Sequence, residues 1–312
     1  MKKTIPIILD CDPGHDDAIA IMLCGNNERF DLRGITTVAG NQTIEKTTYN
    51  ALKLCEHLNI STKVYKGVKE PIVSRVQKVA KNIHGESGLD GPVLKELTRT
   101  YEKKVAVLYI ADEILNSKEK ITMVITGPMT NFALALKLYP EIKENIERVV
   151  FMGGSYQLGN ITPAAEFNIY CDPEAADVVF RSGIPLTMIG LDVTRKVLCL
   201  PEIMKKAASI GGVASKLFDG LMGFFNKTQK EIFGWEGAPL HDPLTIAYLI
   251  DESVIKTKEV YAEVDTTYGS SRGRTNCDMF NLSKNKKNVN VAIEVDVEKF
   301  WNIVYTRIES YL

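Results

Sequence analysis

The chain has 312 residues, of which 45% are hydrophobic and 25% are charged, and its formal net charge is −1. This composition is typical of a globular protein with a closed core, and the length fits one large α/β domain or two small ones. The near-neutral charge argues against nucleic acid or a membrane surface as a partner, and no apolar run approaches the roughly 18 residues of a membrane span.

The cysteines and the N-terminal residues of the sequence indicate the cellular compartment of the protein. Six cysteines are spread along the chain without a Cys-x-x-Cys pair, which predicts reduced thiols rather than disulfides. The start of the sequence runs into the first predicted strand without an apolar signal region. We therefore expect a cytoplasmic protein. The four histidines are also scattered, so a zinc site is not expected.

The first predicted elements are a strand at 5–9 and a helix at 17–26, joined by a turn that contains Pro13 and Gly14. Four carboxylates fall on this turn: Asp10, Asp12, Asp16 and Asp17. The last two lie where the free N–H groups of a helix start favour anions. Four such charges repel one another unless a cation neutralises them, and oxygen ligands suit a hard divalent ion. An ordinary helix cap with acids in the loop is the alternative.

Strand-like and helix-like stretches then alternate. Further strands are predicted at 32–38, 62–66, 121–125, 147–151 and 185–189, and further helices at 44–58, 104–116, 130–138 and 173–182. The region 195–255 is predicted to be mainly helical, followed by strands near 259–264 and 290–295 and a helix from about Val297. This alternation implies an α/β fold with an open, mainly parallel sheet and helices on both faces. No linker interrupts it, so we expect one domain over 1–312.

Ligands of such sheets bind outside the carboxyl ends of the strands, so the residues that follow each strand are candidates. Asn41 follows the second strand, where it is either a ligand contact or a cap for the next helix. Thr126 opens a Gly-Pro turn after the strand 121–125 and offers a neutral oxygen, although such turns are common.

A second group of candidates lies in the irregular segment 152–172. Asn160, Glu166 and Asn168, with Phe167 between the last two, suit the recognition of a ligand rich in hydroxyl groups. A solvated loop would have a similar composition.

Near position 240, His241 and Asp242 precede an apolar helix. A helix cap explains the aspartate well and the histidine poorly. His84 lies in the glycine-rich stretch 82–91, which is long enough to close over a pocket, although a lone loop histidine is usually solvated. Glycine-rich dinucleotide and phosphate loops and the Gly-x-Ser-x-Gly motif are absent from suitable contexts.

Taken together, these segments resemble the inosine-uridine type nucleoside hydrolases over essentially the whole chain. The resemblance is carried by 10–17, 38–41, 126–131, 152–154, 165–168 and 241–242. It implies a Rossmann-like core, one Ca²⁺ per subunit and hydrolysis of the N-glycosidic bond of ribonucleosides without phosphate. It also implies a homo-oligomer, either a dimer or a tetramer, whose only other partner is the small-molecule ribonucleoside.

The resemblance assigns roles to individual residues. It places four groups on calcium: Asp12, Asp17, the backbone carbonyl of Thr126 and Asp242. It places four side chains on the ribose hydroxyls, with Asn160 beside the sugar: Asp16, Asn41, Glu166 and Asn168. Asp12 coincides with the acid that takes a proton from the metal-bound water, and His241 with the residue that faces the leaving base.

The same resemblance bears on the choice of base. The stretch around His84 is similar to the loop of pyrimidine-preferring relatives in which a histidine faces the base, so we expect uridine and cytidine to be preferred. Relatives selective for pyrimidines often carry a tyrosine where this chain has Phe233, which leaves Gln229 as the main polar contact from that helix.

Two other functions remain open on the sequence. The pair Asp10 and Asp12 after a strand superficially fits an aspartate-nucleophile phosphohydrolase, although Pro13 stands where those enzymes need a Thr or Val soon after. A non-catalytic protein that binds a nucleoside or calcium is the other possibility.

Overall fold

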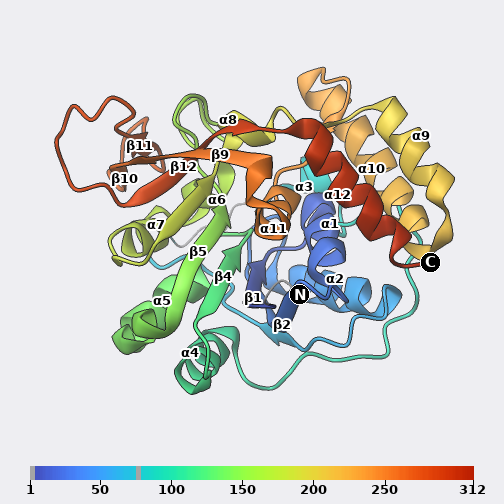
Figure 1. The fold of residues 1–312 in the computed structure, drawn as a ribbon, viewed down its shortest axis with the longest axis horizontal. Coiled ribbons are helices and arrows are strands. Elements are labelled where there is room, and N and C mark those ends of the chain that lie inside the picture. The colour runs from blue at the N-terminus through green and yellow to red at the C-terminus, as the bar shows by residue number, and fades with distance from the viewer. Residues whose placement is uncertain (1–3, 75–78) are drawn as a thin grey trace.

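One central sheet of eight strands organises the computed structural model, which describes residues 4–74 and 79–312 (Figure 1). In spatial order, the strands are β3 (Val64–Lys66), β2 (Phe30–Thr37), β1 (Ile5–Cys11), β4 (Ile121–Ile125), β5 (Ile146–Met152), β6 (Leu186–Ile189), β12 (Val289–Val295) and β9 (Ile255–Val260). Neighbouring strands pair in parallel, except that β9 runs antiparallel to β12. The predicted α/β fold with a mainly parallel sheet is confirmed.

Helices cover both faces of the sheet, because successive residues of a buried parallel strand point to opposite sides. Ile7 and Leu9 of β1 belong to one hydrophobic core, and Ile8 belongs to the other. The first core is closed by α1 (His15–Cys24), α2 (Ile44–His57), α9 (Pro201–Ile210), α10 (Gly212–Phe233), α11 (Pro243–Ile250) and α12 (Val297–Glu309). The second is closed by α4 (Ala106–Asn116), α5 (Thr130–Leu138) and α7 (Pro173–Phe180).

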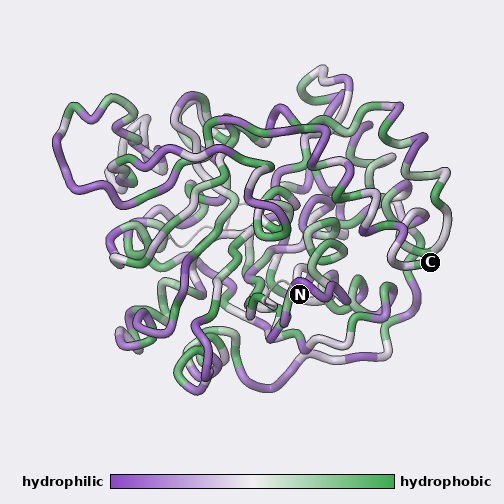
Figure 2. Tube along the Cα trace, in the orientation of Figure 1, coloured by the Kyte–Doolittle hydropathy of each residue, from purple (hydrophilic) through white to green (hydrophobic). Residues whose placement is uncertain are grey.

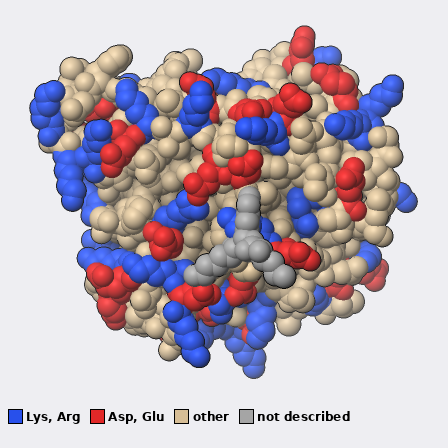
Figure 3. Space-filling model, viewed as in Figure 1, with Lys and Arg blue, Asp and Glu red and all other residues tan. Residues whose placement is uncertain are grey.

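The distribution of hydropathy follows these layers. Figure 2 shows hydrophobic residues along the central strands and the inner sides of the helices, with hydrophilic residues toward the periphery. Lys/Arg and Asp/Glu side chains are intermixed on the face drawn in Figure 3. Among the described residues, no helix is long and apolar enough to cross a membrane.

Short elements complete the fold. Three short helices lie at strand ends or in loops: α3 (Lys81–His84), α6 (Phe167–Cys171) and α8 (Leu191–Thr194). Two 3₁₀ helices, η1 (Pro140–Asn145) and η2 (Glu252–Val254), precede β5 and β9. Two small antiparallel sheets pair β7 (Leu198–Cys199) with β8 (Ala238–Pro239) and β10 (Ala262–Val264) with β11 (Thr275–Cys277).

The predicted strand at 259–264 is wrong as a single element. The side chain of Asn288 accepts a hydrogen bond from the N–H of Ala262 (2.8 Å) and donates one to its carbonyl (2.9 Å). These bonds replace the strand ladder, so β9 ends at Val260 and the chain continues as β10 in a separate small sheet.

Candidate functional site

The turn between β1 and α1 is packed closely against two segments that are distant in the sequence. A β-carbon at Gly14 would lie 2.8 Å from the ring of His84 and 2.9 Å from Asn41 Nδ2. A β-carbon at Gly40 would lie 2.1 Å from Asp12 Oδ2. Both positions require glycine because of these close approaches. The turn, the segment after β2 and α3 therefore meet at the carboxyl edge of the sheet.

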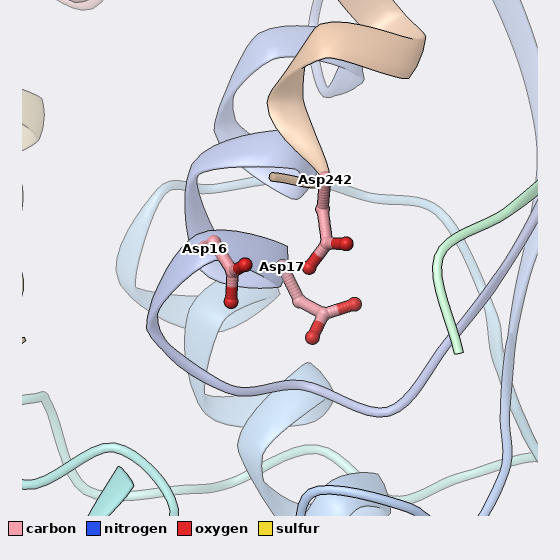
Figure 4. A group of neighbouring side chains, drawn as sticks. All are labelled: Asp16, Asp17 and Asp242. Carbon is pink, nitrogen blue, oxygen red and sulfur yellow. The ribbon is translucent and has the colours of Figure 1, made fainter. Parts of the chain in front are cut away.

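Acidic side chains converge at this edge. One carboxylate oxygen each of Asp16, Asp17 and Asp242 lies within 4.8 Å of the others, and the three side chains are neighbours in Figure 4. The first two come from the first turn of α1, and Asp242 immediately precedes α11. Asp12 lies close enough to repel Asp16 and Asp17. We call these four residues the acidic cluster; each is at most 5% exposed.

Hydrogen bonds fix two members of the acidic cluster. Asp12 Oδ2 accepts from the backbone N–H of Asn41 (2.6 Å), whereas Asp12 Oδ1 is buried without a hydrogen-bond partner in the described ranges. Asp17 accepts from the N–H of Gly14 (3.0 Å) and from the hydroxyl of Thr126 (2.7 Å). The unpartnered oxygen of Asp12 is available to a ligand.

The acidic cluster is electrostatically unfavourable as it stands. Burial raises the pKa of Asp16 to about 7 and that of Asp17 to about 6. Burial and repulsion between neighbouring carboxylates raise the pKa of Asp12 and Asp242 well above their usual range. A divalent cation would supply the compensating charge, and a donor set made only of oxygen suits a hard ion. The cluster could therefore bind a metal.

Asp10 does not join the acidic cluster, although the sequence places it on the same turn. Its Oδ1 accepts hydrogen bonds from the Thr36 hydroxyl (2.6 Å) and from Asn131 Nδ2 (2.8 Å). Burial raises its pKa to about 7. The fourth carboxylate of the cluster is Asp242, which lies far along the chain.

Glu166 and Asn168 form a second polar wall. Glu166 caps α6 and accepts hydrogen bonds from the backbone N–H groups of Gly154 (2.9 Å), Asn168 (2.9 Å) and Ile169 (3.2 Å). The Asn168 side chain donates to the carbonyl of Thr126 (2.8 Å). Both side chains are buried, so they are not part of a solvated loop.

The rest of that loop is more open. Asn160 is exposed and Phe167 is partly buried, and the Asn160 side chain accepts a hydrogen bond from the N–H of Phe167 (2.9 Å). The alternative of a solvated loop therefore holds for the exposed Asn160 and not for the buried Glu166.

Two histidines approach from the other side. His241 Nδ1 lies 2.7 Å from the hydroxyl of Thr194, and burial lowers the pKa of His241 to about 3. His84 ends α3, is buried, and has a pKa well below its usual range because of burial and the neighbouring His15. Both imidazoles are therefore uncharged at neutral pH.

A cavity of about 390 Å³ lies between these groups. Asp12 and Asp17 are buried and do not line it, whereas every other residue predicted for the site does: Asp16, Asn41, His84, Thr126, Asn160, Glu166, Phe167, Asn168, Gln229, His241 and Asp242. The sequence thus predicts the location of the site, while the individual roles remain predictions.

Among the residues in or next to the cavity that were not predicted from the sequence are Arg195, Trp235 and His15. The guanidinium group of Arg195 lines the cavity and donates to the carbonyls of Leu158 (3.1 Å) and Gly159 (2.6 Å). Trp235 also lines the cavity, with its ring centre 5.8 Å from that of Phe233. His15 lies behind His84. Only His15 had a signal, its place within the aspartate-rich turn.

Comparisons with known proteins agree with this geometry. The family model described as inosine-uridine preferring nucleoside hydrolase matches residues 7–302. The pyrimidine-specific ribonucleoside hydrolase RihB of Escherichia coli (strain K12) is 49% identical over 306 residues, which cover 98% of this chain and 97% of that protein.

Solved structures also match nearly the whole chain. A purine-preferring ribonucleoside hydrolase from Gardnerella vaginalis has a TM-score of 0.91 and 36% identity, with 98% of both chains covered. A plant nucleoside hydrolase, PpNRh1, has a TM-score of 0.92 and 27% identity, with 99% of this chain and 100% of that chain covered.

Proposed function

The chain belongs to the inosine-uridine preferring nucleoside hydrolase family, and from that premise we propose that it hydrolyses the N-glycosidic bond of ribonucleosides with the help of Ca²⁺. The products are ribose and the free base, and pyrimidine ribonucleosides are the preferred substrates. The observation that carries the proposal is the buried acidic cluster at the floor of a cavity with amide, carboxylate and imidazole walls.

Four groups would hold Ca²⁺: the carboxylates of Asp12, Asp17 and Asp242 and the backbone carbonyl of Thr126. The unpartnered Oδ1 of Asp12 supports this assignment. The Thr126 carbonyl accepts one hydrogen bond from Asn168 and keeps a second lone pair. When bound, the ion would offset the repulsion among the carboxylates and orient a water molecule.

Asp12 is the proposed general base, because calcium is too weak a Lewis acid to ionise water alone. It takes a proton from the water whose oxygen bonds to the anomeric carbon, while the C–N bond breaks and its electron pair leaves with the base. Asp16 and Glu166 hold ribose hydroxyls, and their negative charge offsets the positive charge that develops on the sugar. Direct attack by water predicts inversion at the anomeric carbon.

His241, His84 and Gln229 are proposed to face the leaving base. The preference for pyrimidines is supported by the 49% identity to a pyrimidine-specific relative rather than by the fold. The fold does not distinguish pyrimidine preference from purine preference, since a purine-preferring hydrolase has a TM-score of 0.91 to this chain.

Chromatography of a panel of ribonucleosides, incubated with the protein with and without a calcium chelator, tests the proposal. We expect ribose and free base from uridine and cytidine, and no turnover with the chelator. Release of phosphate from nucleoside monophosphates with the base retained would instead identify an aspartate-nucleophile phosphohydrolase. Nucleoside binding without turnover would identify a non-catalytic nucleoside-binding or calcium-binding protein.

We also propose a homo-oligomer, either a dimer or a tetramer, in the cytoplasm. All six cysteines are free thiols, as expected in a reducing compartment. Light scattering coupled to size-exclusion chromatography would measure the mass of the assembly against the 34.7 kDa of one chain.

A further inference from the structure

One side of the cavity is formed by residues 157–165, which we call the cavity loop. Gly159, Asn160 and Ile161 of this loop line the cavity. The backbone N–H groups of Asn160 and Ile161 donate to the carbonyl of Ala165 (3.0 and 3.3 Å), so the loop folds back on itself. These bonds shape the cavity loop but do not attach it to any other element.

Arg195 supplies the attachment. It directly follows α8, and its guanidinium group donates to the carbonyls of Leu158 (3.1 Å) and Gly159 (2.6 Å). In the ranges that the structure describes, no other hydrogen bond joins the cavity loop to a residue outside 155–167. A planar guanidinium group holds its donors in a fixed fork, which suits two neighbouring carbonyls.

The helix that precedes Arg195 is itself bonded to two other parts of the site. The carboxylate of Asp192 in α8 accepts from the backbone N–H of Tyr156 (2.9 Å), just before the cavity loop. The hydroxyl of Thr194 lies 2.7 Å from His241 Nδ1. The position of Arg195 is therefore fixed relative to the start of the loop and to the opposite side of the cavity.

Asn160 is the residue of the cavity loop that can bind a ligand. Its Oδ1 accepts from the backbone N–H of Phe167 (2.9 Å), a group that can only donate, so its side-chain NH₂ group points away from Phe167. Asn160 is exposed, and its NH₂ group donates to no other described residue. Two donors are thus free for a ligand, and their position depends on the backbone that Arg195 holds.

We propose that Arg195 is a positioning residue that holds the cavity loop in place, so that the NH₂ group of Asn160 donates to an oxygen of the bound ligand. The identity of that oxygen rests on the proposed function, under which it belongs to the ribose. Ribonucleosides carry no anionic group, so the guanidinium group has no charge on the ligand to bind. It acts instead through the carbonyls of Leu158 and Gly159.

Hydrogen exchange of the whole protein, measured by mass spectrometry without a ligand, tests the attachment. Arg195→Met keeps an unbranched side chain and removes the donors. We expect peptides from the cavity loop to exchange about tenfold faster in this variant, because the bonds that oppose local opening are lost. Unchanged exchange would overturn the proposal, whether or not the protein hydrolyses nucleosides.

Arg99→Met is the matched control. Arg99 also donates to backbone carbonyls, those of Ser61 (3.3 Å) and Thr62 (2.7 Å), but it lies outside the cavity. This variant should leave both the exchange of the cavity loop and the turnover of uridine unchanged. Equally fast exchange of the loop in Arg99→Met and Arg195→Met would indicate general loosening of the fold and would contradict the proposal.

Turnover tests the link to the ligand. We expect Arg195→Met and Asn160→Ala each to lower kcat/KM for uridine about tenfold, the value of one lost hydrogen bond. The double variant should lose little more than either single variant, since Arg195 acts through Asn160. Full additivity of the two losses would contradict that route. An unsubstituted protein without turnover would refute the proposed function, and the exchange measurement would still decide the attachment.

Arg195→Lys separates the fork from the charge. It keeps the positive charge, but a compact ammonium group cannot reproduce the planar fork on two carbonyls. We expect exchange of the cavity loop and kcat/KM for uridine to lie between the values of the unsubstituted protein and Arg195→Met. Full activity in Arg195→Lys together with fast exchange of the loop would show that the charge matters and not the attachment, which would overturn the proposal.

Discussion

The floor and the wall of the cavity are built from different parts of the fold. The floor is the acidic cluster, which is attached to the end of β1 and to the first residues of α1 and α11. The wall comprises His84, Gln229, Phe233 and Trp235, which belong to α3, the last part of α10 and the segment after it. The floor is buried, whereas Phe233 is 47% exposed.

Under the proposed function, the floor would carry out bond cleavage and the wall would select the base. Groups at strand ends are held in place by the backbone hydrogen bonds between the strands. Their geometry is therefore shared by proteins with the same sheet. Groups on short helices and loops can change without altering the sheet. A purine-preferring hydrolase and a pyrimidine-specific hydrolase both match nearly the whole of this chain, as expected if the wall decides the base.

Removing a carboxylate from the floor should have the largest effect. Asp12→Ala deletes the proposed general base together with a calcium ligand, so kcat/KM for uridine should fall by about 10⁴-fold. Asp112→Ala, an aspartate on α4 that pairs with Lys104 at the surface, is the control and should leave activity unchanged. A metal-free sample, verified by elemental analysis, that retains full activity would refute the calcium assignment.

The proposed ribose contacts, which Asp16 of the floor shares with Glu166 and Asn168, predict the next largest effect. Asp16, Glu166 and Asn168 are buried, so a missing hydroxyl leaves polar groups without partners. We expect kcat/KM for 2′-deoxyuridine to be roughly two to three orders of magnitude below that for uridine, less than the ~10⁴ of a fully sealed site. The exposed Asn160 is the reason for the smaller value. Comparable values for the two substrates would exclude a clamp on the sugar hydroxyls.

The floor also predicts how the metal-free protein responds to pH. In the folded protein, burial raises the pKa of Asp16 from 3.8 to about 7 and that of Asp17 to about 6. Between roughly pH 4 and pH 7, the folded state therefore keeps protons that the unfolded state has released, and stability falls as pH rises. Calcium should offset this loss once the carboxyl groups are ionised.

Thermal unfolding with calcium and with a chelator measures this linkage. We expect the difference in Tm to be larger at pH 8 than at pH 5, because the ion replaces protons at the lower pH. The same difference at both pH values would show that these carboxyl groups do not bind the ion.

The floor was also the easier part to predict from the sequence. Three of its four carboxylates lie on one turn of eight residues, and strand and helix patterns on either side place that turn at the edge of the sheet. The sequence could not show that Asp10 points into a different hydrogen-bond network, since that depends on the side chains of β2 and α5.

The wall depends on contacts that no local pattern encodes. The pairing of His15 with His84 joins residues 69 positions apart and requires the loop to fold back onto α1. Arg195 enters the cavity because its guanidinium group bonds to two carbonyls of a loop nearly 40 residues earlier. Neither contact follows from hydrophobic periodicity, which reports only the buried face of each element.

Changes to the wall should alter the choice of base more than the cleavage itself. We expect kcat/KM to be higher for uridine and cytidine than for inosine, and His84→Ala to lower turnover of pyrimidine nucleosides about tenfold. Ribose binding should change little, which inhibition by free ribose would measure. Equal or better kcat/KM on inosine would refute the pyrimidine preference, and an unaffected His84→Ala enzyme would remove that residue from the site.

The smallest effect is expected at the outer end of the wall. Phe233 lines the cavity, is 47% exposed and packs beside Trp235, so a hydroxyl group added to its ring would reach the solvent or the ligand without being buried. Because a partly solvated hydrogen bond contributes little, Phe233→Tyr should raise kcat for uridine by only about two- to fivefold. Phe280→Tyr, at a ring that is 84% exposed and outside the cavity, is the matched control. A change in kcat of a hundredfold or more in Phe233→Tyr would show that the wall also contributes to bond cleavage. It would contradict the proposed separation of roles between the two regions.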